Sequence, residues 1–157
     1  IGNGAPKHFL SWSNNLTWRN FDLSVFFRGT FGFDVFNMRK YGMGLQGCGT
    51  DNVLRSAYLE DKNIRTGGGV ISSYFLEDGS FIKLENVTLG YNFTPKNRKL
   101  LDNMRIYLSA KNLFTLTGYS GNDPSIIDVN GIQPGVDSNS AYPTATQLSL
   151  GVTLRFK

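Results

Sequence analysis

The strongest constraint on the fold of this chain is an alternation of apolar and polar residues, with a period of two, over runs of ten residues and more. The cleanest run lies at about 146–156, where leucine, valine and phenylalanine alternate with polar residues and glycine. Successive side chains of a β-strand point to opposite faces of the sheet. Such a run therefore predicts a strand with one apolar and one polar face, and the chain as a whole is expected to be all-β.

The alternation predicts five antiparallel strands. They are expected at about 8–18, 21–35, 80–93, 104–117 and 146–156. Only Arg19 and Asn20 separate the first two strands, which is typical of a β-hairpin. Within 80–93 the apolar residues change phase near Glu85 and Asn86, so we expect a β-bulge at that point.

The connections between these strands alternate between short and long. The short ones are residues 19–20 and 94–103, and the long ones are about 36–79 and 118–145. Short turns at one end of a sheet and long loops at the other are typical of outer-membrane β-barrels. The sequence therefore predicts periplasmic turns at 19–20 and 94–103, and extracellular loops at 36–79 and 118–145.

Strand length and charge distinguish a membrane barrel from a soluble sandwich. Eleven residues tilted by about 45° rise about 26 Å, close to the roughly 25 Å apolar band of a barrel, whereas soluble strands mostly have about five or six residues. A dry core tolerates the charged residues of the polar faces poorly, and a water-filled lumen accommodates them. In a lumen, the basic residues either attract anionic ligands or are simply hydrated. The candidate lumen-lining residues are Arg28, Lys83, Arg105 and Lys111.

Aromatic residues gather on the apolar faces, beside the short turns and the final residue. An aromatic girdle at a membrane interface has this distribution, although aromatic residues also favour strands in general. Asn112 falls on the apolar face in the simple register, which is costly in hydrocarbon, so we expect an interfacial position or a bulge that turns it inward. The candidate girdle comprises Trp18, Phe21, Tyr91, Phe93 and Phe156.

Five strands cannot close a barrel, because the smallest common barrels need about eight. An open sheet in lipid leaves unpaired backbone groups at both edges, at high energetic cost. We therefore expect the chain to pair with further strands of the same parent polypeptide and not to be self-sufficient. The strand at 146–156 is expected to close the barrel against the first strand of that parent.

Composition and motifs argue against several other functions. The net charge of +4 is dispersed, which does not favour a nucleic-acid partner. One Cys and one His cannot form a zinc site of the usual composition. No catalytic motif is present, and the adjacent carboxylates Glu60–Asp61 and Glu77–Asp78 would point to opposite faces of a strand. We expect no enzymatic activity, no metal and no cofactor.

The long loops contain candidate contact residues. Tyr119 and Asp123 are candidates for contact with a substrate or partner, whereas Asn122-Asp123-Pro124 also fits an Asx-type turn that only shapes the loop. Cys48, among glycines, is expected to be a spectator. Tyrosines that could stack on sugar rings are Tyr41, Tyr58, Tyr74, Tyr119 and Tyr142.

Several segments carry a specific resemblance. The most specific is LEDGSFIKLENVTLGY at 76–91, and others lie at 1–6, 21–29, 106–115 and 118–124. They resemble the C-terminal part of the SusC/RagA family, the TonB-dependent outer-membrane transporters of Bacteroidetes. The resemblance covers essentially the whole chain and implies a fragment of a barrel of about 22 strands.

What this resemblance implies concerns a larger protein. It implies a Gram-negative outer-membrane location in contact with lipid and lipopolysaccharide, and import of oligosaccharides or oligopeptides. The partners would be the remainder of the barrel with its plug, a SusD-like surface lipoprotein, and TonB, bound through an N-terminal part outside these residues. The alternatives are a soluble all-β glycan-binding module and an outer-membrane enzyme or adhesin barrel. The final strand also resembles an assembly signal, formed by Leu148, Leu150, Val152, Leu154 and Phe156.

Overall fold

The computed structural model describes residues 2–44, 52–59, 70–95, 101–127, 131–138 and 142–156. The expectations for Cys48 and for the pair Glu60–Asp61 lie outside these ranges. The chain divides into two compact units, and each is described by itself. The strand unit comprises 9–29, 82–116 and 144–157, and the loop unit comprises 1–8, 30–81 and 117–143.

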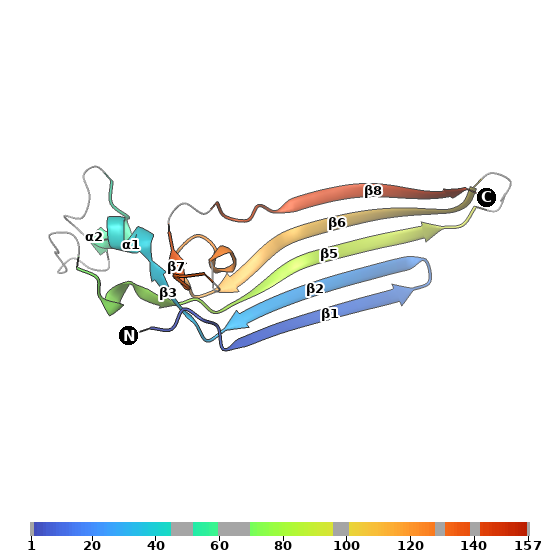
Figure 1. Ribbon diagram of the computed structural model, residues 1–157. Helices are drawn as coiled ribbons and strands as arrows, with labels where there is room; N and C mark the ends of the chain where they lie inside the picture. Colours follow the sequence, from blue (N-terminus) through green and yellow to red (C-terminus); the bar gives the residue numbers. More distant parts are fainter. Residues whose placement is uncertain are drawn as a thin grey trace. The chain divides into compact units, whose positions relative to one another are not determined.

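The strand unit is built on a five-stranded antiparallel sheet with the order β1-β2-β5-β6-β8 (Figure 1). These strands follow one another in the sheet in the order of the sequence, so the sheet is a meander. The predicted all-β class and five-stranded antiparallel sheet are confirmed. The strands are β1 (His8–Trp18), β2 (Phe21–Phe31), β5 (Phe81–Phe93), β6 (Leu101–Thr117) and β8 (Gln147–Phe156).

Two of these strands begin or end at residues that differ from the prediction. β2 ends at Phe31 and not near residue 35, because Gly32 takes a left-handed backbone conformation (φ 74°) that interrupts the strand. β6 begins at Leu101 and not near residue 104, and its pairing with β8 includes a register shift between Leu101 and Asn103. This shift in register lets β6 extend to residues that lie before the regular apolar–polar alternation of the sequence begins.

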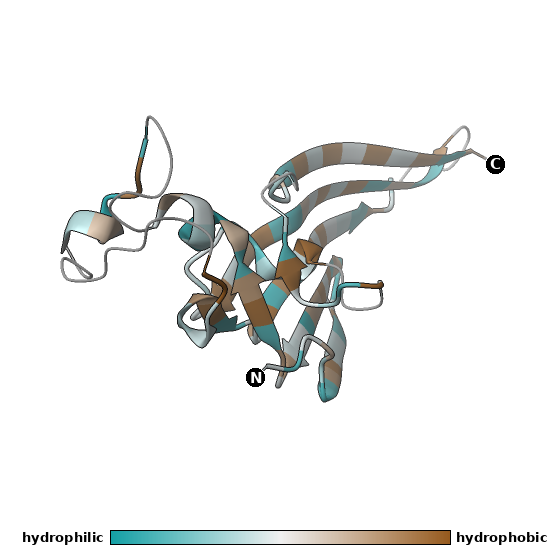
Figure 2. Cartoon of the chain, turned by 60° about the vertical axis from the view of Figure 1, so that its left-hand side comes forward, coloured by the Kyte–Doolittle hydropathy of each residue, from teal (hydrophilic) through white to brown (hydrophobic). Residues whose placement is uncertain are grey.

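The two faces of the sheet differ in chemistry. On β8, the apolar residues of the alternation have exposed fractions from 47% for Leu154 to 75% for Leu150. Figure 2 shows this alternation as brown bands along the ribbon that ends at the C-terminus. On the polar face, a Cβ at Gly90 would lie 2.5 Å from the Asp22 carboxylate oxygens. A glycine in this strand therefore makes room for a charged side chain of another strand.

β6 contains a backbone irregularity at Asn112, which has a left-handed conformation (φ 53°). Its side-chain Nδ2 donates to the carbonyl of Ala145 at 3.3 Å, and its own carbonyl accepts from Thr146 Oγ1 at 2.9 Å. These bonds satisfy polar groups of a residue that unbroken alternation would place on the apolar face. The left-handed conformation lies at the residue for which the sequence predicts an interfacial position or a bulge, and both alternatives stay predictions.

The loop unit contains a small three-stranded sheet of β4 (Leu76–Asp78), β3 (Asp34–Asn37) and β7 (Val136–Asp137). β3 pairs antiparallel with β4 and parallel with β7. The Asn37 side chain caps the helix that follows β3, accepting from the Lys40 amide at 2.9 Å. None of the described helices is long and apolar enough to cross a membrane. They are α1 (Met38–Met43), α2 (Ser56–Leu59), and the 3₁₀ helices η1 (Ser73–Phe75) and η2 (Pro124–Ile126).

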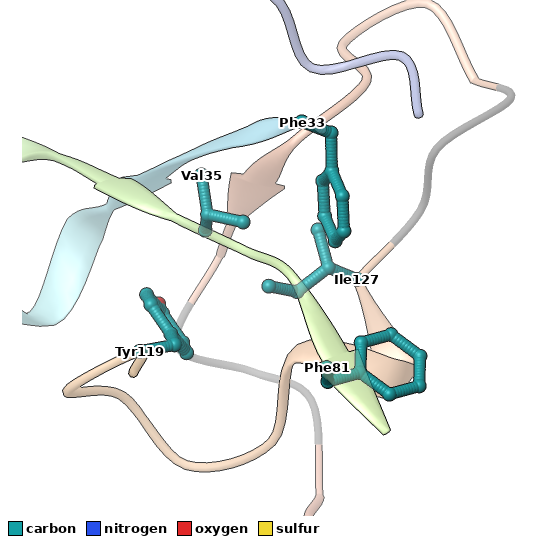
Figure 3. Packing of buried hydrophobic residues seen from close by; sticks show 5 residues of the cluster. All are labelled: Phe33, Val35, Phe81, Tyr119 and Ile127. Carbon is teal, nitrogen blue, oxygen red and sulfur yellow. The ribbon is translucent and has the colours of Figure 1, made fainter. Parts of the chain in front are cut away.

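The loop unit has its own hydrophobic core. Figure 3 shows five buried side chains that pack together although they come from distant parts of the sequence. A second cluster forms around Phe75, whose ring meets that of Tyr41 edge-on, with 5.2 Å between centroids. The described parts of the predicted loops are therefore folded, with buried apolar residues such as Phe75, Tyr119 and Ile127. The five residues of the main core are Phe33, Val35, Phe81, Tyr119 and Ile127.

Candidate functional site

The residues of the candidate girdle are exposed on the strand unit. Their exposed fractions run from 38% for Tyr91 to 68% for Trp18, which is unusual for large aromatic side chains in water. Phe21 of β2 and Tyr91 of β5 stack with 4.8 Å between ring centroids, in a tilted arrangement. Neighbouring strands thus bring girdle residues together, and their role at a lipid interface stays a prediction.

On the polar face, Asp22 is the centre of a hydrogen-bonded group that joins three strands. Arg105 on β6 donates from Nε to Asp22 Oδ1 at 3.1 Å and from Nη2 to Oδ2. Asn92 on β5 donates from Nδ2 to Asp22 Oδ1 at 2.8 Å. A guanidinium that engages both carboxylate oxygens is the strongest geometry for such a pair. Arg105 is therefore committed to a carboxylate of its own sheet.

The other candidate lumen-lining residues have varied surroundings. Arg28 of β2 forms an ion pair with Glu85 of β5, with 3.3 Å between Nε and Oε2. Lys111 is exposed and pairs in register with Gln147 of β8. Since Arg28 and Arg105 both face carboxylates, the polar face favours internal charge pairing over the capture of anions by these two arginines.

Lys83 does not have the open position that the sequence suggested. Only 1% of it is exposed, and its Nζ donates to Thr144 Oγ1 at 2.7 Å. Lys83 and its neighbour Leu84 are both buried, so strict alternation fails in this part of β5. In a regular strand, residues an odd number of positions apart lie on opposite faces. Ile82 and Leu89 are seven positions apart and are both exposed, which agrees with a change of phase near Glu85 and Asn86.

Tyr119 and Asp123 are buried in the loop unit, with exposed fractions of 6% and 7%. The Tyr119 hydroxyl donates to Asp137 Oδ2 at 2.6 Å, and burial raises the pKa of the Tyr119 phenol far above its usual value. Asp123 Oδ1 accepts from the Ser125 amide at 2.9 Å and caps η2. The structure therefore favours the turn-forming alternative for Asp123 and gives neither side chain a surface for contact with a ligand.

The five candidate tyrosines for sugar stacking differ in their exposure, from buried through partly buried to exposed. Tyr41 and Tyr74 pack against Phe75, and Tyr119 belongs to the core. Tyr58 and Tyr142 are 56% and 86% exposed. Of the five, these two are the most exposed.

A polar cluster around Glu77 was missed by the sequence interpretation, which treated this residue only as one of an adjacent carboxylate pair. Glu77 Oε1 accepts from Asn37 Nδ2 at 3.3 Å and from Ser120 Oγ at 2.8 Å. Its Oε2 accepts from the Ser120 amide at 2.8 Å. Lys40 Nζ lies 3.6 Å from Oε1 and 4.4 Å from the centre of the Tyr74 ring. One carboxylate thus joins β4, the start of α1 and the segment that follows β6.

The Glu77 cluster borders a cavity of about 600 Å³ within the loop unit. A cavity of this size and polarity can hold several units of a polar ligand. The described residues contain no cluster of three or more side chains suited to hold a metal ion. The cavity is lined by Asn37, Arg39, Lys40, Leu54, Arg55, Glu77, Asp78, Gly118 and Ser120.

Comparisons with known proteins agree on one type of relative. No protein-family profile matches the chain. The TonB-dependent receptor P3 of Formosa agariphila is 27% identical over 99% of the chain, which spans 17% of that receptor. The TonB-dependent receptor SusC of Bacteroides thetaiotaomicron is 28% identical over 97% of the chain, which spans 15% of it.

A solved structure has the same fold. The structure of the RagAB peptide transporter matches 96% of the chain with a TM-score of 0.75 and 24% identity, and the match covers 17% of the matched transporter chain. At this identity the match establishes the fold alone. The chain thus spans about a sixth of the length of the proteins it matches. The matched proteins are named as receptors and transporters, and none of these names denotes an enzyme.

Proposed function

We propose that this SusC/RagA-type segment of a TonB-dependent transporter forms five adjacent strands in the wall of an outer-membrane β-barrel. In this proposal the apolar face of the sheet contacts lipid, and the polar face contacts the lumen. The loop unit lies on the extracellular side, and the connections between β1 and β2 and between β5 and β6 are periplasmic turns. The segment is placed at the C-terminal end of the barrel, where its last strand closes the wall.

The exposed apolar face is the observation that carries this proposal. Within the described residues, the apolar side chains at every second position of β8, from Leu148 to Phe156, are all at least 47% exposed. A soluble sheet of this length would need a second layer over such a face, because exposed apolar patches of this extent favour association. The opposite face carries the paired charges of Asp22 and Arg105, which suit a hydrated lumen. Lipid on one side and water on the other satisfy both faces.

The alternation of β8 also supports a role in assembly. An unpaired strand edge presents free backbone groups that can template on another strand. We propose that Leu148, Leu150, Val152, Leu154 and Phe156 form the signal that the insertion machinery recognises. The same side chains then contact lipid in the finished barrel.

The proposed activity is import coupled to TonB, shared with a SusD-like surface lipoprotein. Support comes from the names of the matched proteins, a SusC receptor and a RagAB peptide transporter. The substrate class is an oligosaccharide or an oligopeptide. The plug and the segment that binds TonB belong to parts of the transporter beyond this chain.

Purification of the parent protein from outer membranes in mild detergent tests this proposal. We expect a polypeptide several times larger than 17.5 kDa that migrates faster on a gel before heating than after, as folded barrels do, and that co-purifies with a lipoprotein. A monodisperse, folded particle close to 17.5 kDa in the absence of detergent would reject the barrel. The soluble glycan-binding module, with Tyr58 and Tyr142 as its exposed rings, would then be the better description.

A further inference from the structure

The charged side chains around the cavity in the loop unit are not needed to form the wall of a barrel. Three cationic side chains, Arg39, Lys40 and Arg55, line it together with the two carboxylates of Glu77 and Asp78. The wall of the cavity therefore carries one more positive than negative charge. How the protein pairs these charges decides what the cavity can bind.

Both carboxylates already have partners within the protein. Glu77 accepts three hydrogen bonds, from Asn37 and Ser120, and lies within 3.6 Å of the Lys40 ammonium group. Asp78 Oδ1 accepts from the Ser80 amide at 2.9 Å and from Ser80 Oγ at 2.6 Å. Glu77 thus neutralises Lys40 and holds Ser120 in position at the rim of the cavity.

Within the described residues, neither Arg39 nor Arg55 has such an anion beside it. Arg39 Nη1 donates to the neutral side-chain oxygen of Asn122 at 2.8 Å, which orients the guanidinium and leaves its charge uncompensated. In the described part of the chain, no hydrogen bond or ion pair engages the Arg55 side chain, and both arginines are exposed. A guanidinium presents five donors in a planar fork that matches the two oxygens of a carboxylate or sulfate.

We propose that this cavity binds an anionic group, a carboxylate or a sulfate, carried by an extracellular oligomer, with Arg39 and Arg55 as its ligands. The inference rests on the proposed function because it takes the loop unit to face the outside of the cell. Glu77 is a positioning residue, which keeps Lys40 and Ser120 in place and does not touch the ligand. Neutral oligomers of the same length gain nothing from the two guanidinium groups.

Binding measurements on the full-length transporter in detergent test this site. The probes are an oligogalacturonate, a sulfated galactan oligomer and a glutamate-rich peptide, each beside a neutral counterpart of equal length. In the double variant Arg39→Gln/Arg55→Gln we expect the affinity for at least one anionic probe to fall about tenfold or more, because each lost contact is a charge-assisted hydrogen bond. Affinity for the neutral counterparts should not change.

Two further variants separate binding from folding. Arg39→Lys/Arg55→Lys keeps the charge and should recover part of the affinity, although without the fork geometry. Arg155→Gln removes one positive charge from a side chain of the strand unit that is 78% exposed, and it should leave all the affinities unchanged. Raised salt should weaken the binding of anionic probes by the native transporter and have little effect on the double variant.

The results that would overturn the site are distinct from failure of the proposed function. Equal affinities of the native protein and the double variant for every probe would reject the site, as would an equal loss for anionic and neutral probes. The gel shift on heating reports the barrel separately. A parent that shows no such shift contradicts the proposed function, whereas a shifted, lipoprotein-bound parent with unchanged affinities contradicts the cavity proposal alone.

Discussion

The strand unit and the loop unit use similar apolar residues in opposite ways. In the loop unit, Phe33 and Val35 are 2% and 0% exposed and pack in a core. In the strand unit, Trp18 and Leu150 are 68% and 75% exposed. Burial in the loop unit comes from the chain itself, as in a water-soluble protein. The strand unit has no such cover among the described residues, so in the proposed barrel its stability would come from lipid and from neighbouring strands.

The polar groups show the same contrast. On the strand unit, ion pairs such as Asp22–Arg105 stand on one face of a sheet. In the loop unit, Glu77 accepts hydrogen bonds from Asn37 and Ser120, which lie on two segments distant in sequence, and helps to fix their arrangement. The two units therefore respond to different perturbations, and each of the following substitutions acts on one of them.

The largest effect is expected from Phe33→Ala in the loop unit. Loss of this buried ring leaves a cavity beside Val35 and should destabilise the unit by about 3–5 kcal/mol. Hydrogen exchange of the parent in detergent should show lost protection in peptides of the loop unit, such as 117–127, and unchanged protection in β8. The same truncation at Phe9, which is 65% exposed on β1, is the control. Equal loss of protection in both units would mean that they do not unfold separately.

The next effect is expected from Leu150→Arg on the apolar face of β8. An arginine at the middle of the lipid face costs about 2–4 kcal/mol in barrels, so less folded parent should reach the outer membrane. Ser149→Arg places the same charge on the opposite face and is the matched control. The amount of heat-modifiable protein in outer-membrane fractions measures both. If the two variants accumulate equally, the assignment of lipid and lumen faces is wrong. If Leu150 were exposed only to water, its replacement by arginine would change the free energy of unfolding by no more than about 0.5 kcal/mol.

The strand unit could be predicted largely from sequence because its information is local. Period-two alternation reports the face of each residue directly, and five strands in their order follow from it. The resemblance to SusC/RagA transporters, read from segments such as 76–91, agrees with the relatives found. The alternation failed where the strand is irregular, as at Lys83, which is buried and not open to a lumen.

The loop unit could not be predicted in this way because its contacts join distant segments. Ser120 and Glu77 are 43 positions apart, and Arg39 and Asn122 are 83 apart. No local period encodes such pairs, so Glu77 appeared only as one of two adjacent carboxylates. Tyr119 and Asp123 were noticed as polar loop residues, yet burial and capping define what they do. Conspicuous residue types in a loop do not show which of them face outward.

A smaller effect is expected from Gly90→Ala on the polar face. The new Cβ would lie 2.5 Å from the carboxylate of Asp22, which must move away from Arg105 and Asn92. Because the clash is with the end of a side chain, we expect a cost of about 1–3 kcal/mol, measured as a lower urea midpoint of the parent in detergent. Gly118→Ala, where the added Cβ meets nothing within 4 Å, should leave the midpoint unchanged. An unchanged midpoint for Gly90→Ala would mean that the Asp22 group adds nothing to stability.

The smallest effect at neutral pH is expected from Tyr119→Phe, which removes the hydrogen bond to Asp137 and should destabilise the loop unit by about 1 kcal/mol. The effect of pH is more specific. Burial raises the pKa of Tyr119 in the folded state, so the native protein keeps the phenol proton while the unfolded chain loses it near pH 10. The contribution of Tyr119 is therefore complete below about pH 10 and is lost as the pH rises further, by up to about 1.4 kcal/mol per pH unit.

This linkage makes the difference between the native protein and Tyr119→Phe depend on pH in a fixed direction. Hydrogen-exchange protection of loop-unit peptides, corrected for the intrinsic exchange rate, should favour the native protein at pH 8. The advantage should shrink between pH 10 and 11, because only the native protein carries the buried phenol. Tyr142→Phe alters a ring that is 86% exposed and should show no such change. A difference that stays constant up to pH 11 would show that Tyr119 is not shielded from water, and would contradict a loop unit that buries this residue by itself.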